Sequence, residues 1–192
     1  FVSDSDDELV ADSRGDAINA VPSDAVMICD FASLSDLNAL AVVDNSPFIS
    51  FLNQKSNLLK FVNLCADAEG GDNGAILSLH YSAKNTISFL FVLSLDNPRK
   101  RAQMKELIDD LCSGVIIKKY SGVTISKAVI PEISYAFYGN YLIASTSHVT
   151  VESSIRHLES RTSVMDNPLY SRMSKSINGK VIIHVNHQNI GK

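Results

Sequence analysis

The longest apolar stretch lies near the middle of the chain and predicts a buried strand. Residues 86–95 carry apolar side chains at both odd and even positions. Successive side chains of a strand point to opposite faces, so this pattern indicates a central strand covered on both sides. After a break at residues 96–98, residues 99–113 repeat apolar side chains with the spacing of one helix face, and Gly114 follows as the left-handed residue that ends the helix. The apolar positions of this helix are Met104, Leu107, Ile108 and Leu111.

Shorter apolar runs predict the rest of a sheet and the helices that cover it. Residues 75–82 alternate, with Ser78 and His80 on the polar face, and turn back through residues 84–85 into the central strand as an antiparallel hairpin. The Gly139-Asn140 link has the length and residue types of a two-residue hairpin turn. Further strands are expected at 26–29, 115–120, 123–130, 133–138, 141–145 and 181–185. Further helices are expected at about 34–43, at 47–66, from Ser147 onward and at 169–176.

Together these elements predict an α+β fold, with a mainly antiparallel sheet of about seven or eight strands and helices packed against it. Residues 1–21 are acidic and small, which is typical of a flexible tether, and residues 22–178 form a single α+β domain. Residues 178–186 repeat the pattern of residues 23–31: a polar turn, an apolar strand and a polar residue. Residues 179–192 are therefore either the start of a second repeat or a closing strand.

Composition narrows the function classes. The chain has 192 residues, a formal net charge of −4 and 45% hydrophobic residues, which is typical of a globular domain. A negative net charge argues against nucleic-acid binding, because phosphate affinity needs a cationic surface. No run of 18 apolar residues is present, so we expect no membrane span. Because the chain begins at Phe1 rather than at Met, we expect a processed or truncated product, with any signal or anchor upstream.

Three cysteines, too few for a disulfide framework, each lie in an apolar run. They are Cys29, Cys65 and Cys112. We interpret them as buried small hydrophobic residues, and their odd number leaves at least one unpaired within the chain.

No established catalytic or cofactor motif is present, and no cofactor is expected. The sequence has no nucleophile elbow, phosphate loop, dinucleotide glycine fingerprint or zinc-protease motif. The acidic loop at residues 67–74 lacks the ligand spacing of a calcium loop and is interpreted as a turn. The remaining candidates for metal binding are His184 and His187, with His80 as a third ligand. His184 and His187 would point to opposite faces of a continuous strand, so they converge only if the strand ends near Asn186.

Aromatic residues gather around the predicted hairpin at Gly139-Asn140. They include Tyr135, Tyr138 and Tyr141, which are candidates for an interaction surface. Tyrosine is also a preferred strand residue, so cross-strand packing is the alternative interpretation.

Three segments resemble a family of uncharacterised exported bacterial proteins that are membrane-anchored or lipoprotein-like. The segments are residues 22–30, residues 138–147 with the helix that follows, and residues 167–170. The resemblance covers most of residues 22–192, but its motifs are structural. It implies an extracytoplasmic location, in the periplasm or at the cell surface, and a parent protein with several modules. It implies no catalytic or ligand-binding residue.

Two functions follow as hypotheses. The first is a non-catalytic binding or scaffolding module of an exported, envelope-associated protein, with a protein partner or a second copy bound at an exposed edge strand or at the tyrosine hairpin. The second is a hydrolase or metal-dependent enzyme that uses His184, His187 and His80.

Overall fold

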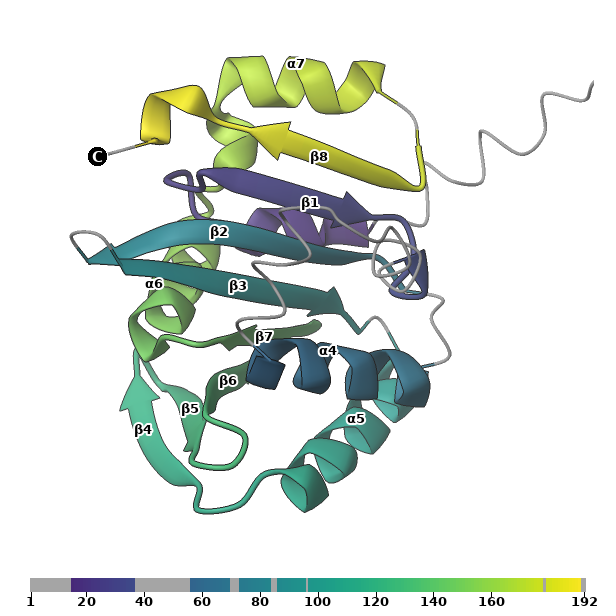
Figure 1. Ribbon diagram of the computed structural model, residues 1–192, viewed down its shortest axis with the longest axis vertical. Coiled ribbons are helices and arrows are strands. Elements are labelled where there is room, and N and C mark those ends of the chain that lie inside the picture. Colours follow the sequence, from purple (N-terminus) through teal and green to yellow (C-terminus); the bar gives the residue numbers. More distant parts are fainter. Residues whose placement is uncertain are drawn as a thin grey trace, which may run out of the picture.

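The computed structural model describes residues 15–36, 56–69, 73–83, 86–95, 97–177 and 179–190. In this part of the chain, eight strands form one sheet in the order β4-β5-β6-β7-β3-β2-β1-β8, and each neighbouring pair is antiparallel (Figure 1). The strands are β1 (Met27–Phe31), β2 (Ala75–Ala83), β3 (Thr86–Ser94), β4 (Ile116–Tyr120), β5 (Val123–Ala128), β6 (Ile133–Tyr138), β7 (Tyr141–Ser145) and β8 (Val181–Val185). The α+β prediction is confirmed.

Helices cover both faces of this sheet. The α-helices are α4 (Ser56–Glu69), α5 (Pro98–Leu111), α6 (His148–Ser160) and α7 (Pro168–Ser176), and the 3₁₀ helices are η1 (Gly15–Ala20), η2 (Val164–Asp166) and η3 (His187–Asn189). One core cluster joins α4 and α5 to the sheet, and a second joins η1 and α6 to the opposite face. Figure 1 shows α7 at the upper rim, beside β8.

The central strand is buried on both faces, as its sequence predicts. Phe89, Phe91 and Leu93 of β3 belong to the core cluster on the α4–α5 side, whereas Leu90 and Val92 belong to the cluster on the α6 side. The hairpin with β2 is also confirmed, since the two strands pair antiparallel along most of their length.

Two helices begin in the same way, at an Asn-Pro pair. The side chain of Asn97 accepts a hydrogen bond from the backbone N–H of Arg99, and Asn167 does the same for Leu169. Proline then occupies the first turn of α5 and of α7, where its missing N–H costs no helical hydrogen bond. These pairs fix where each helix starts.

The predicted role of Gly114 as the end of α5 is wrong. The helix ends at Leu111, and Cys112 caps it in an extended conformation. Gly114 does have a left-handed φ of +65°, but it uses this conformation in the connection to β4, where an added Cβ would lie 3.1 Å from Val129.

The predicted tether contains an ordered segment. Ala17, Ala20 and Val21 are fully buried in the core cluster on the α6 side, and η1 contacts β3 and α6. The ordered domain therefore includes residues from Gly15 onward, rather than from Pro22. Residues 1–14 lie outside the described residues, as do most of the helix expected at 34–43 and the first part of the helix expected at 47–66.

The first and last described strands lie side by side. β8 pairs antiparallel with β1, from Phe31 opposite Val181 to Met27 opposite Val185. β8 is thus the outermost strand of the same sheet, while the suggestion that residues 179–192 also begin a second repeat stays a prediction.

Candidate functional site

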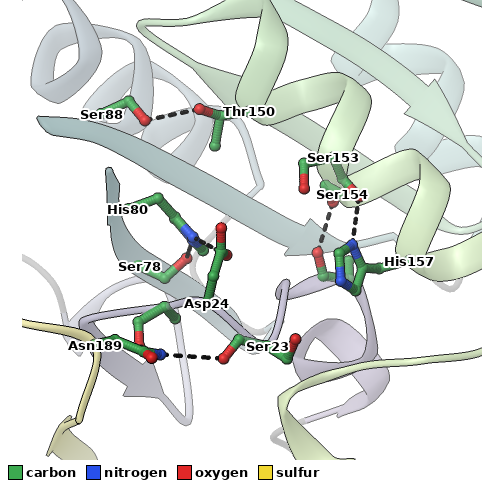
Figure 2. A network of polar contacts seen from close by, with 12 residues as sticks. Ser23, Asp24, Ser78, His80, Ser88, Thr150, Ser153, Ser154, His157 and Asn189 are labelled. Carbon is green, nitrogen blue, oxygen red and sulfur yellow. Dashed lines mark hydrogen bonds and ion pairs between the residues drawn. The ribbon is translucent and has the colours of Figure 1, made fainter. Parts of the chain in front are cut away.

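A chain of polar contacts links the turn before β1 to the middle of β2. His80 Nδ1 lies 3.0 Å from Asp24 Oδ1, and His80 Nε2 lies 2.8 Å from Ser78 Oγ (Figure 2). With the proton of the neutral imidazole on Nδ1, His80 donates to Asp24 and accepts from Ser78. The hydrogen bond from His80 lowers the pKa of Asp24, and this outweighs the partial desolvation that raises it.

The order Asp24–His80–Ser78 has the connectivity of a hydrolase triad, but the environment does not suit a nucleophile. Ser78 is only 1% exposed. A neighbouring cavity of about 180 Å³ is lined by Asp24 and His80 but not by Ser78. A substrate in that cavity would therefore not reach the hydroxyl, and the network is better explained as a clamp between the turn and β2.

Further buried hydroxyls fasten α6 to the sheet and to η1. Ser88 and Thr150 share a 2.7 Å hydrogen bond, and Ser154 Oγ donates to the carbonyl of Ala20 at 2.6 Å. In β2, polar residues alternate with apolar ones and point to the face of the sheet that η1 and α6 cover. The hydrogen bonds of Ser88 and Ser154 pair buried polar groups on this same face. The polar face predicted for Ser78 and His80 is therefore buried under η1 and α6 rather than exposed.

The three candidate histidines do not converge. His184 of β8 lies opposite Ile28 of β1, which lies opposite Ser78 of β2, and His80 lies two residues further along β2. Two strand spacings across the sheet and two residues along β2 therefore separate His184 from His80, or roughly 12 Å between their Cα atoms. Direct ligands must all lie about 2 Å from one ion. Both ring nitrogens of His80 are also in contact with Asp24 and Ser78. Within the described ranges, no three His, Cys, Asp or Glu side chains are grouped to hold a metal.

His184 and His187 do share a cavity, because β8 ends at Val185 and η3 follows. This cavity, here called the α7–β8 cleft, has a volume of about 240 Å³ and lies between α7, the start of β1 and the end of β8. Tyr170 and His184 both line it, and the centroids of their rings are 4.6 Å apart. Its lining residues are mostly apolar: Ala25, Val26, Met27, Ile28, Val164, Asn167, Leu169, Tyr170, Met173, His184, Val185, Asn186, His187 and Gln188.

The rim of the α7–β8 cleft exposes large apolar side chains. Leu169 and Met173 of α7 and Val185 of β8 each leave about half of their surface in contact with solvent. A rim of this kind around an apolar hollow is typical of a site that binds another molecule. No short sequence motif predicts this cleft, because α7 and the start of β1 are about 140 residues apart in the sequence. The two elements come together only when the sheet has formed.

The three tyrosines occupy different environments. Tyr135 is buried, with its ring 6.2 Å from Phe61 and 6.5 Å from Phe137, so it contributes to the core. Tyr138 and Tyr141 face each other across the hairpin and pack, partly buried, against the core cluster on the α6 side. An interaction role for Tyr138 and Tyr141 stays a prediction.

All three cysteines are buried and free. Burial raises the pKa of the Cys29 thiol to about 12 and raises the pKa values of Cys65 and Cys112 as well. Since the thiolate is the reactive form, none of these thiols suits a nucleophile near neutral pH.

Comparisons with known proteins add no relative. No protein-family model, no curated protein and no solved structure matches this chain. Among the described helices, none is both long enough and apolar enough to cross a membrane.

Proposed function

We propose that this chain is a non-catalytic binding or scaffolding module of an exported, envelope-associated protein, and that it holds a protein partner at the α7–β8 cleft. The observation that carries the proposal is an apolar cleft of about 240 Å³ beside an edge strand, with exposed apolar side chains at its rim.

The size of the cleft favours a single apolar side chain as its occupant. Sites for drug-sized ligands usually have volumes of about 300–1,000 Å³, whereas a cavity of about 150 Å³ is enough for benzene. A leucine, phenylalanine or tryptophan from a partner therefore matches the α7–β8 cleft better than a cofactor does.

The position of the cleft explains how the rest of such a partner would be held. Among the described strands, β8 pairs only with β1 and is the last strand on its side of the sheet. An extended segment can add to an edge strand through backbone hydrogen bonds while one of its side chains enters a neighbouring pocket. Asn186, His187 and Gln188 supply polar groups to the lining of the cleft.

An extracytoplasmic location is compatible with the free cysteines. Their burial and raised pKa values keep the reactive thiolate scarce, so an oxidising compartment would not readily link them. Support for export otherwise comes from the resemblance of residues 22–192 to exported proteins. A full reading frame without any export signal upstream of Phe1 would contradict this part of the proposal.

A peptide selection tests the binding site. Random peptides displayed on phage and selected on the folded protein should converge on sequences with one large apolar residue. Met173→Glu should weaken their binding by at least about tenfold, because a carboxylate at the rim would be desolvated when the anchor enters. Fluorescence anisotropy with labelled peptides would measure this change.

The chain offers a matched control for that substitution. Val149 lies on α6 and, like Met173, is 48% exposed, but it does not line the α7–β8 cleft. Val149→Glu should leave peptide affinity unchanged. Selection that yields no peptide, or peptides that bind Met173→Glu as tightly as the original chain, would overturn the proposed site.

The hairpin is a second surface where a partner could dock. Replacing Tyr138 and Tyr141 together by serine would remove the two partly buried tyrosine rings that face each other there. If peptide binding and assembly both stay unchanged in that variant, the hairpin has no part in the interaction.

A further inference from the structure

The sheet has a second edge, at β4, that is more exposed than the edge at β8. Residues 116–119 are all exposed, with Ile116 at 62% and Ile117 at 67%. Val129 and Ile130, just beyond β5, are exposed beside them. Figure 1 shows β4 at the lower rim of the sheet, and in the part of the chain that the structure describes it pairs only with β5.

Both faces of this edge carry apolar side chains. Ile116 points to the same face as Lys118, which reaches α6 and contacts Glu152 at 2.6 Å, so Ile117 points to the α4–α5 side. Monomeric proteins usually protect an edge strand with charged side chains, especially lysine, or with proline, a bulge or a covering element. β4 carries Lys118 and Lys119, but Lys118 is engaged with Glu152 and the two lysines leave Ile116 and Ile117 exposed. Exposed isoleucines on both faces instead favour continuation of the sheet.

The sequence of β4 indicates what continues it. A strand that pairs antiparallel with a copy of itself has a two-fold axis through one residue, because paired side chains must point to the same face. Centred on Lys118, such a pair would place two lysines opposite each other, which is destabilising. Centred on Ile117, it places Ile117 opposite Ile117, Ile116 opposite Lys118 and Val115 opposite Lys119.

We propose that β4 pairs antiparallel with β4 of a second copy of this chain, about a two-fold axis at Ile117. Each lysine then lies along a β-branched neighbour, where its aliphatic stem can pack while its ammonium stays in solvent. Lys118 keeps its contact with Glu152 on the α6 side. The two sheets join into one, and the two α7–β8 clefts remain free at its far ends.

Disulfide trapping tests both the pairing and its register. The three native cysteines are buried, so a single introduced thiol reports on its own position. Directly opposed residues have Cα atoms about 4.5–5.5 Å apart, which suits a disulfide. Ile117→Cys should therefore form a covalent dimer under mild oxidation. Lys119→Cys should not, because the two copies of residue 119 would be four residues apart along the strands, or roughly 13 Å.

Sedimentation velocity gives an independent measurement. A strand pair this short buries little area, so we expect a weak dimer whose apparent mass rises above the 20.9 kDa of the monomer only at high protein concentration. Ile117→Lys should hold the mass at 20.9 kDa at every concentration, and an unchanged thermal melt would show that this exposed substitution leaves the fold intact.

Two results would overturn the proposal. One is a chain that stays monomeric at all concentrations and whose Ile117→Cys variant does not cross-link. The other is cross-linking of Lys119→Cys as fast as Ile117→Cys, which would indicate random collisions rather than a paired edge.

Discussion

Asp24 lies at the surface and binds the ring of a buried histidine, His80. Its side chain is 63% exposed, yet it lies 3.0 Å from the ring of His80, which is almost fully buried. A buried imidazole without hydrogen-bond partners would lose several kcal/mol of solvation, by order of magnitude. The carboxylate and Ser78 together prevent that loss, which explains why a polar pair is tolerated in the middle of β2.

Acid should weaken this clamp, and Asp24→Asn tests it. The pKa of Asp24 is lower in the folded chain than in the unfolded chain, so its contribution to stability is complete above the usual aspartate value of about 4 and is lost as the pH falls through the folded value. Asp24→Asn should cost about 1 kcal/mol at pH 7, a figure kept small by solvent screening, and less as the pH falls below about 4. Urea denaturation at several pH values would measure the difference.

Ser78→Ala provides the comparison, because it leaves the contact between Asp24 and His80 in place. This variant should be less stable than the original chain but should keep the same dependence on pH between about 5 and 3. A cost of Asp24→Asn that is constant across this range would contradict the role assigned to the carboxylate.

At the scale of elements, comparing two glycines with a left-handed φ distinguishes the cost of backbone strain from the cost of a steric contact. Gly122 has a φ of +79° and no heavy atom within 4 Å of the place an added Cβ would take, whereas Gly114 has a φ of +65° and would place a Cβ 3.1 Å from two atoms of Val129. Gly122→Ala should cost about 1 kcal/mol for its backbone conformation alone. Gly114→Ala should cost more, because Val129 must also move.

Chemical denaturation of the two alanine variants would compare their free energies of unfolding. Both substitutions add the same methyl group at a similar φ, so the difference between them reports the contact with Val129. Equal costs would show that the chain around Val129 moves freely enough to accept the methyl group.

The sequence predicts the elements of this fold better than their contacts. Local signals suffice for β3, whose apolar run is long, and for the start of α5, where Asn97 and Pro98 have a defined role. Burial of residues 15–21 has no local signal, because η1 is short and owes its burial to β3 and α6. The sequence does not predict the contact between Asp24 and His80 either, because this contact depends on the register of β1 against β2.

At the scale of the whole molecule, the protection of backbone amides from hydrogen exchange should decrease from the middle of the sheet towards its edges. β3 is paired on both sides, and residues 88–94 are buried, whereas residues 116–119 of β4 are exposed. Amide hydrogens of β3 should exchange only through global unfolding, and those of β4 should exchange at least about tenfold faster through local opening. Native-state hydrogen exchange at low protein concentration would measure both.

The same exchange experiment at high protein concentration tests the proposed pairing of β4 with β4 of a second copy. Amides of β4 should then become more protected, while those of β3 stay unchanged. Similar protection of β3 and β4 at low concentration would contradict the view that this edge is open in the monomer.

The pairing of β1 with β8 has a consequence for biosynthesis. Phe31 and Val181 are opposite each other in the sheet but 150 residues apart along the chain. At about 5–20 residues per second, a ribosome needs roughly 8–30 s to make the intervening segment. During that interval the side of β1 that pairs with β8 has no neighbour, so the nascent chain exposes an unpaired strand edge until β8 emerges, and slower translation lengthens this exposure.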